Sequence, residues 1–375
     1  MSAWEAINNG VVEDNNKTRE KYWQHWKNYT KAFAVDPYLS QCSNVQQIVI
    51  LTAFAARVRT GYYGKGHTVR VPTVTKALAA ISKTIELAGE PSPLYKAEKT
   101  YKTPVARLIE GYRREDPPAT PQLALPVKVP QECQNAGLRS HHPFKLAVGD
   151  LAIIAFYYLL RVGEYTKPRV FIKDGKTKRA TRTVQFSVGN VGFFKNNTIL
   201  PRRSKLEHLL QADSCTLKIT NQKNGRMGET IHQYAIKSTN CPVKALARRV
   251  NHILAHGGTS ENLLCDVYDK FNNRWLQVTP QHMITSIRTA VDTLHLEASG
   301  INPDLVGVHS LRAGGAMSLK LQGESDTTIM KMGRWTSLTF LQYIHNQIAH
   351  LSKDISEKMS QNLHFQNISA IEKAE

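Results

Sequence analysis

Four separated segments carry side chains that could together act on a phosphodiester. Guanidinium groups present a rigid fork of donors that can hold the non-bridging oxygens of a phosphorane. Lysine can protonate a departing oxygen, and histidine can manage the proton of an attacking phenol. Tyrosine, with an ordinary pKa of about 10, needs such neighbouring cations to become a nucleophile. The residues are Arg161 and Glu164, Lys223, His309 and Arg312, and Trp335 and Tyr343.

The same region offers little to a metal ion. It has no clustered carboxylates of the kind that a two-metal site requires. The pair His141-His142 has no Cys or carboxylate set at zinc spacing. We therefore expect a phosphoryl transfer that uses neither a metal ion nor a cofactor.

The charge of the chain favours a polyanionic partner. Its 375 residues include 49 Lys and Arg against 30 Asp and Glu, a net charge of +19. Residues 151–250 alone hold 19 basic and 5 acidic residues, a surplus of 14. Because neutralising phosphates dominates binding to nucleic acid, this excess predicts a nucleic acid of some kind as the partner. A solvated basic face is the simpler alternative.

Proline spacing divides the chain. Five prolines fall between Asp116 and Pro130, which predicts an extended linker over 116–130. Before it, apolar periodicity predicts helices over 17–34, 45–59, 74–87 and 105–113, a helical bundle that occupies residues 1–115. The aromatic stripe Tyr22, Trp26, Tyr29 and Phe33 is expected to be core.

Residues 131–375 are expected to form a second, mixed domain. Helices are predicted over 144–160, 242–256, 280–296, 310–321, 326–332 and 337–349, and short strands over 184–186, 198–201, 215–220 and 229–234. The turn Asn221–Gly228 joins the last two strands into a hairpin. The whole is predicted to be mostly α with a small β-sheet, an α+β fold.

The order of these pieces resembles the tyrosine recombinase, or phage integrase, family. The text HSLRAGGAMSL followed by MKMGRWTSLTFLQYI is most similar to its crypton-like, eukaryotic or algal mobile-element branch. The resemblance covers both domains, and it implies that residues 1–115 are a core-binding, SAM-like DNA-binding domain and 131–375 the catalytic domain. It also implies a site-specific recombinase or integrase that acts on double-stranded DNA and needs neither metal nor ATP.

The resemblance implies a role for each motif residue. Tyr343 would attack the scissile phosphate and form a 3′-phosphotyrosine, while Arg161 and Arg312 would hold the phosphate oxygens. Lys223 would be the general acid, and His309 would assist proton transfer. Trp335 stands where many relatives have histidine and would position the phosphate, and Glu164 would support the geometry of the site.

Simpler interpretations remain open for several residues. Arg161 could be a helix-end arginine paired with Glu164, and Lys218, in the preceding strand, competes with Lys223 as general acid. Separation of Arg161 from Lys223 by 62 positions leaves room for the basic segment 173–182, either an insertion that contacts the DNA backbone or an exposed hairpin. The residues expected to bind DNA are Lys65, in the Gly-rich loop 59–70, and Lys176, Lys178, Arg179, Arg182 and Arg226.

The end of the chain predicts self-association. Ile344, Ile348, Leu351, Ile355 and Met359 recur at helical spacing and form one apolar face. The family resemblance implies that such a helix docks on a neighbouring protomer, giving a tetramer of two dimers on DNA; folding back onto its own core is the alternative.

Two other functions fit the same motifs. One is a DNA-binding protein derived from a mobile element that no longer cuts, and the other is a type IB topoisomerase. The sequence shows no signal peptide and no apolar run long enough for a membrane span, so we expect an intracellular protein without a membrane partner, nuclear if it is eukaryotic.

Overall fold

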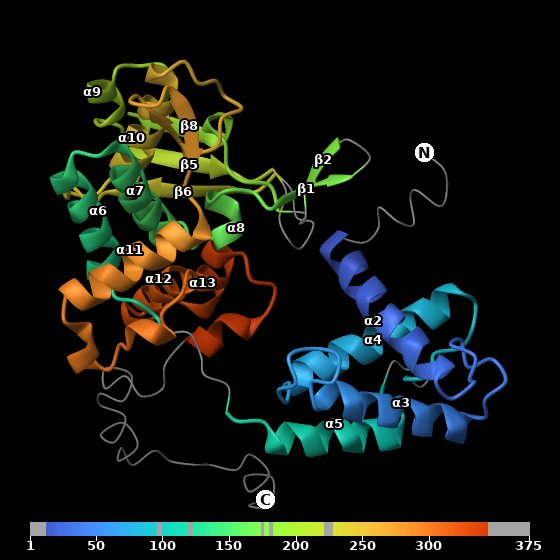
Figure 1. Ribbon diagram of the computed structural model, residues 1–375. Helices are drawn as coiled ribbons and strands as arrows, with labels where there is room; N and C mark the ends of the chain where they lie inside the picture. The colour runs from blue at the N-terminus through green and yellow to red at the C-terminus, as the bar shows by residue number, and fades with distance from the viewer. Residues whose placement is uncertain are drawn as a thin grey trace, which may run out of the picture. The chain divides into compact units, whose positions relative to one another are not determined.

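The computed structural model describes residues 13–95, 100–118, 123–173, 176–179, 183–220 and 228–343. The chain divides into two compact units, Met1–Ala119 together with Arg169–Arg182, and Thr120–Pro168 together with Thr183–Glu375 (Figure 1). The described residues are mostly helical and carry small antiparallel sheets, so the predicted fold class is confirmed. No helix among them is long and apolar enough to cross a membrane.

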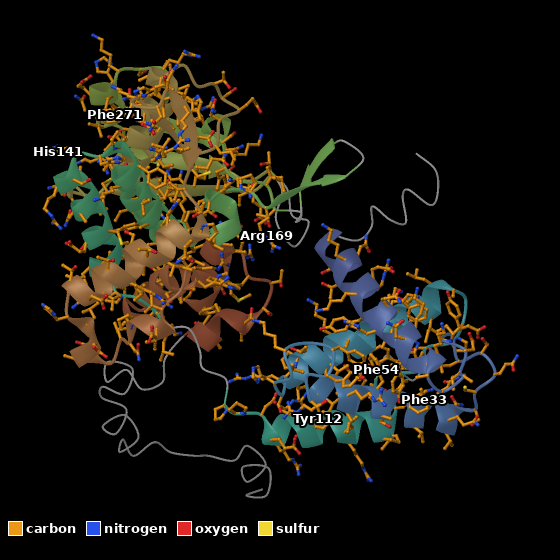
Figure 2. All side chains as sticks on the ribbon, in the orientation of Figure 1. Phe33, Phe54, Tyr112, His141, Arg169 and Phe271 are labelled. Atoms are coloured by element: carbon orange, nitrogen blue, oxygen red, sulfur yellow. The ribbon has the colours of Figure 1, made fainter. Side chains whose placement is uncertain are left out.

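The described residues of the first unit form the helices α2 (Glu13–Lys31), α3 (Asn44–Arg59), α4 (Val71–Leu87) and α5 (Thr103–Glu115). All four were predicted from apolar periodicity. Trp26 and Tyr29 are buried, as expected of the aromatic stripe, and they pack on Phe54 of α3. Phe33 is 56% exposed, because α2 ends two residues earlier and Phe33 leaves its face (Figure 2).

Asp116 fastens the end of this unit. Its carboxylate accepts from the Arg59 guanidinium and, at 2.8 Å, from the backbone amide of Val71, the first residue of α4. The Arg59 guanidinium also donates to the Val69 carbonyl. The first residue of the predicted linker is therefore part of the helical bundle.

The predicted linker is also shorter at its other end. Helix α6 (Lys128–Ser140) begins inside the range 116–130, which corrects the prediction of an extended segment there. Pro130 does not prevent it, because the first turn of a helix needs no amide donor at that position. Val129 and Pro130 are buried, so burial favours the helix.

The second unit is built on helices α6, α7 (Pro143–Tyr157), α8 (Val162–Tyr165), α9 (Leu206–Leu209), α10 (Pro242–Ala255), α11 (Pro280–Thr293), α12 (Ser310–Leu321) and α13 (Asp326–Gly333). Short 3-10 helices lie at Val188–Asn190, Leu296–Ser299, Pro303–Leu305 and, as η4, Leu338–Tyr343. Helix α7 is the centre of the core: every residue from Ala147 to Phe156 is buried. The helix predicted over 337–349 is a 3-10 helix in the part that the structure describes.

Antiparallel pairing joins the described strands into three sheets. One is the hairpin β1 (Val170–Lys173) with β2 (Lys176–Arg179), so the basic segment does form a hairpin. The second has the order β4-β3-β5-β6, with β3 (Val191–Lys195), β4 (Thr198–Leu200), β5 (Ser214–Lys218) and β6 (Thr230–Tyr234). The third pairs β7 (Asp266–Asp269) with β8 (Arg274–Gln277).

The sheet partly matches the predicted strands. The hairpin of β5 and β6 is confirmed, with Lys218 opposite Thr230. The strand predicted over 184–186 is wrong. The Phe186 amide donates to the Glu164 carbonyl, and the Phe186 carbonyl accepts from the Leu264 amide, both at 2.9 Å. Phe186 therefore bonds to a helix turn and a loop and does not pair with a neighbouring strand.

Candidate active site

The candidate site begins at the turn that ends α7. Leu159 has φ of 48°, a left-handed backbone that few residues other than glycine adopt. This turn presents the Leu159 carbonyl to two arginines at once. Arg312 donates to it, and Arg334 donates to it at 3.2 Å. One backbone oxygen thus links segments more than 150 residues apart in sequence.

Arg161 and Glu164 follow in the single turn of α8. The Glu164 carboxylate accepts from the Arg161 backbone amide at 2.8 Å and from its guanidinium at 3.2 Å. Glu164 is buried, whereas the Arg161 side chain keeps 19% of its surface exposed. The helix-end pairing considered from the sequence is therefore present.

Two neighbouring residues hold α8 in place. The Glu164 carbonyl accepts from Phe186, and the Gly163 carbonyl accepts from the Gln185 side chain at 2.9 Å. A four-residue helix is too short to be stable without such tertiary support.

Helix α12 brings Arg312 to the same place. Arg312 is 2% exposed, and its two terminal nitrogens donate to the carbonyls of Leu159 and Gly333, which fixes the plane of the guanidinium. Gly314 and Gly315 permit the close approach. A Cβ at Gly314 would lie 2.0 Å from the Leu125 oxygen, and one at Gly315 would lie 2.5 Å from the Phe156 oxygen. His309, one turn before Arg312, is exposed at the start of α12.

The turn after α13 supplies the other wall. The Trp335 ring lies 4.2 Å from the Arg312 guanidinium carbon, a cation–π contact. Gly333 makes room for the ring, because a Cβ there would lie 1.6 Å from a Trp335 ring carbon. Trp335 also packs on Phe340 of η4, with ring centroids 5.6 Å apart. From the sequence, Trp335 could be a core residue, a residue that positions the phosphate, or both; the structure shows its packing on Phe340 and its contact with Arg312.

Arg334 completes the cluster and was not assigned a role from the sequence. It is buried, and its guanidinium donates to Glu164 at 2.8 Å. Burial lowers the pKa of Arg334 from its ordinary value, the Glu164 carboxylate opposes that shift, and the positive charge of Arg161 adds to it. Its only sequence signal is its place in Gly-Arg-Trp, since a surface arginine gives the same letter.

The remaining predicted residues are placed less fully. Tyr343 is the last residue of η4, three positions after Phe340, which is buried in a small cluster with Ala316 of α12. Lys218 is exposed at the end of β5.

Some of the residues predicted to bind DNA belong to the part of the chain that the structure describes, and others do not. Lys65 is exposed in its loop. Lys176, Lys178 and Arg179 lie in β2. Lys223, Arg182, Arg226 and the apolar stripe from Ile344 to Met359 lie outside the described residues.

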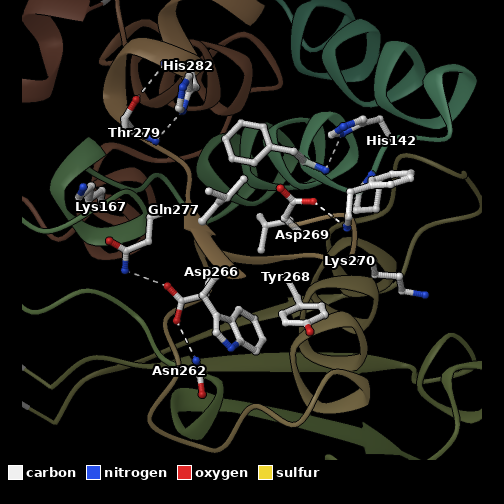
Figure 3. A pocket seen from close by; sticks show the side chains of 16 residues that line it. His142, Lys167, Asn262, Asp266, Tyr268, Asp269, Lys270, Gln277, Thr279 and His282 are labelled. Carbon is white, nitrogen blue, oxygen red and sulfur yellow. Dashed lines mark hydrogen bonds between the residues drawn. The ribbon is translucent and has the colours of Figure 1, made fainter. Parts of the chain in front are cut away.

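A separate cavity of 1220 Å³ lies beside the β7–β8 hairpin (Figure 3). Several of its polar side chains already have hydrogen-bond partners. Asp266 accepts from Asn262 and Gln277, and Thr279 and His282 cap the start of α11. None of the predicted catalytic residues lines it. Among the described residues, no three His, Cys, Asp or Glu side chains gather in a way that could hold a metal ion.

Comparison with known proteins gives structural likeness only. No protein-family model and no curated protein matches the chain. Similar solved structures include the Tn1549 transposon integrase in complex with circular intermediate DNA, at 11% identity and TM-score 0.44, covering 84% of this chain and 85% of that one.

The XerH site-specific recombinase, bound to palindromic difH substrate, has 12% identity and TM-score 0.47 over 83% of this chain and 72% of that one. XerA recombinase has 14% identity and TM-score 0.37 over 93% and 100%. Because these scores and identities are low, the function proposed below rests on the residues of this chain.

Proposed function

We propose that this chain is a site-specific DNA recombinase of the tyrosine type. The single observation that carries the proposal is the meeting of Arg161, Glu164, Arg312 and Trp335 around the end of α7. These residues come from three segments, and the sequence pattern alone had grouped them by the chemistry of a phosphorane. Arginines immobilised before substrate arrives need no reorganisation as charge develops, which is what lowers the barrier to phosphoryl transfer.

The reaction follows from the side chains. The Tyr343 phenol attacks phosphorus and gives up its proton with the help of His309, while Arg161 and Arg312 neutralise the non-bridging oxygens. The bond from phosphorus to the 5′ oxygen breaks, and that oxygen takes a proton from Lys223. The product is a 3′-phosphotyrosine and a free 5′ hydroxyl. Attack by another 5′ hydroxyl reverses the steps, so rejoining needs neither ATP nor a metal ion.

The two parts of the chain would share the DNA. Residues 1–115 would serve as the core-binding domain and 131–375 as the catalytic domain, with Lys65 and the basic hairpin of β1 and β2 on phosphates. The apolar stripe that begins at Ile344 would join neighbouring protomers into a tetramer. Membership of the crypton-like branch would make the natural substrates the ends of a mobile element.

The test is covalent capture on nicked suicide duplexes that carry candidate element ends. The wild-type chain should form a protein–DNA adduct that resists denaturation, and Tyr343→Phe should abolish it. Tyr165→Phe is a matched control, because this buried tyrosine lies beside Glu164 and is not expected to react. Adducts that persist in Tyr343→Phe would overturn the nucleophile. Unselective relaxation of supercoils by a monomer would favour a topoisomerase instead.

A further inference from the structure

Arg334 joins the two supports on which the predicted phosphate-binding arginines rest. One terminal nitrogen donates both to the Leu159 carbonyl, at 3.2 Å, and to the Glu164 carboxylate, at 2.8 Å. Leu159 is also the acceptor of Arg312, and Glu164 is also the partner of Arg161. Arg334 therefore shares one hydrogen-bond acceptor with each of the two guanidinium groups.

The position of Arg334 is costly to the fold. Its backbone is left-handed, with φ of 59°, at the end of α13, where glycine is the usual residue. Its side chain is 3% exposed, and its Nε is buried with no hydrogen-bond partner among the described residues. Backbone strain and a buried unpaired donor each disfavour folding, and such features gather where a function requires them.

Burial separates Arg334 from the DNA. A side chain with 3% of its surface exposed has no face to offer a phosphate, whereas Arg161 keeps 19%. Its planar fork suits a bridge between a carboxylate and carbonyls, which the single ammonium of lysine does not match. Its effect on a phosphate must therefore pass through its neighbours.

We propose that Arg334 is a positioning residue, which orients Arg161 through Glu164 and Arg312 through the Leu159 carbonyl. Its consequence for strand cleavage rests on the proposed function, but the geometry itself does not. Removing Arg334 takes away one donor from the Glu164 carboxylate and one donor from the Leu159 carbonyl. Both acceptors then hold their remaining arginine less firmly, so the guanidinium groups of Arg161 and Arg312 gain freedom to move.

The experiment compares Arg334→Gln with the wild-type chain on a nicked duplex that gives the adduct. We expect single-turnover adduct formation to slow by about 100-fold, the effect of misplacing a reacting group by about 1 Å. The dissociation constant for the duplex and its dependence on salt should stay at the wild-type values. If Arg334 touched a phosphate, the slope of log affinity against log salt would fall by about 0.9, and the proposal would be overturned. A wild-type cleavage rate would overturn it equally.

Two further variants keep the outcome decisive if glutamine prevents folding. Arg334→Lys keeps the charge on a shorter side chain and loses the second terminal nitrogen, which donates to the Tyr158 carbonyl at 3.5 Å. We expect this variant to fold, to hold Glu164 and Leu159 less firmly, and to cleave about tenfold more slowly; a lysine variant with the wild-type rate would overturn the proposal. In Glu164→Gln combined with Arg334→Lys, the loss should be smaller than the product of the single losses, because both changes break the same link. Independent, multiplying losses would count against it.

The matched control is Arg248→Lys. Arg248 also binds a buried carboxylate, Asp150, in the same unit, with a nitrogen–oxygen distance of 2.6 Å. This variant should lose thermal stability and keep the wild-type rate of adduct formation in the folded protein. Slow cleavage in the control would show that any buried arginine matters, and a purely structural role would then explain Arg334.

A readout without cleavage separates this inference from the proposed function. In ¹⁵N-arginine NMR spectra of the full chain, the guanidinium signals of Arg161 and Arg312 should show restricted rotation, which Arg334→Lys should release. If the wild-type chain gave no adduct but this effect appeared, the recombinase proposal would fail and the positioning role would stand. If the rotation of both guanidinium groups stayed the same in Arg334→Lys as in the wild-type chain, the positioning role would fail.

Discussion

At the scale of single residues, the site depends on its glycines as much as on its charged and aromatic side chains. Gly333 leaves room for the Trp335 ring, and that ring lies against Arg312. Gly315 likewise leaves room for α12 against the end of α7, and Gly314 leaves room for α12 against the backbone of Leu125. The motif His-Ser-Leu-Arg-Ala-Gly-Gly thus contains both Arg312 and the glycines that let its helix pack closely against its neighbours.

Gly333→Ala tests this directly. The added methyl overlaps the indole, so we expect the free energy of unfolding to fall by about 1–3 kcal/mol, the usual cost of overpacking, and adduct formation to slow as Trp335 is displaced. Chemical denaturation and single-turnover assays would measure both. Gly111→Ala is the control: it lies in α5 with open space around it and should be stabilised by about 0.5–1 kcal/mol. Unchanged unfolding of Gly333→Ala would contradict the contact.

Sequence reasoning was strongest for residues whose letters are chemically distinctive. It singled out Arg161, Arg312 and Trp335, because their order and spacing together made the pattern. In the structure Arg312 contacts the Trp335 ring, and Arg161 shares Glu164 with Arg334. Sequence reasoning missed Arg334, since a buried arginine and an exposed one have the same letter. It also missed the Leu159 carbonyl, because a backbone oxygen leaves no mark in a sequence.

At the scale of elements, apolar periodicity located the helices well and the strands poorly. Helices α2 to α5, α7 and α10 to α13 begin and end within a few residues of the predictions. The segment 184–186 had the residues of a strand, but its backbone partners are Glu164 and Leu264, which no local pattern specifies. Helix α6 was missed because Pro130 in its first turn follows four other prolines that resemble those of a linker.

The contact of Asp116 with Arg59 and Val71 makes the first unit sensitive to acid. The hydrogen bond from Arg59 holds the pKa of the Asp116 carboxyl below its ordinary 3.8. Its contribution to stability is therefore complete above pH 3.8 and is lost as the pH falls below that value. We expect Asp116→Asn to weaken the unit at neutral pH and the difference from wild type to vanish in acid.

Amide hydrogen exchange of α4 and α5 in the full chain would follow this difference. Glu110→Gln is the control, because its ion pairs with Arg113 and Arg114 are exposed and worth little. A difference between Asp116→Asn and wild type that persisted unchanged in acid would show that the carboxylate charge is not the cause.

At the scale of the whole molecule, the net charge of +19 should govern the strength of DNA binding. We expect log affinity to fall linearly with log salt concentration, by about 0.9 for each phosphate neutralised. Lys65→Ala removes an exposed cation of the Gly-rich loop and should reduce the slope by about that amount. Titrations of a labelled duplex at several salt concentrations would measure it.

Lys83→Ala is the matched control for that measurement. Lys83 is also exposed in the first unit, but it is paired with Glu86 at 3.3 Å. It should leave the slope unchanged. Equal slopes for Lys65→Ala and wild type would remove the Gly-rich loop from the DNA-binding surface.

The shared Leu159 oxygen has a consequence for how the candidate site would be studied by mutation. Alanine scanning cannot delete a peptide carbonyl, so an atom that serves two arginines would pass unnoticed in a conventional mutant library. Chemical synthesis offers the missing tool: an ester in place of the next peptide link makes that oxygen a weaker acceptor while every side chain stays the same.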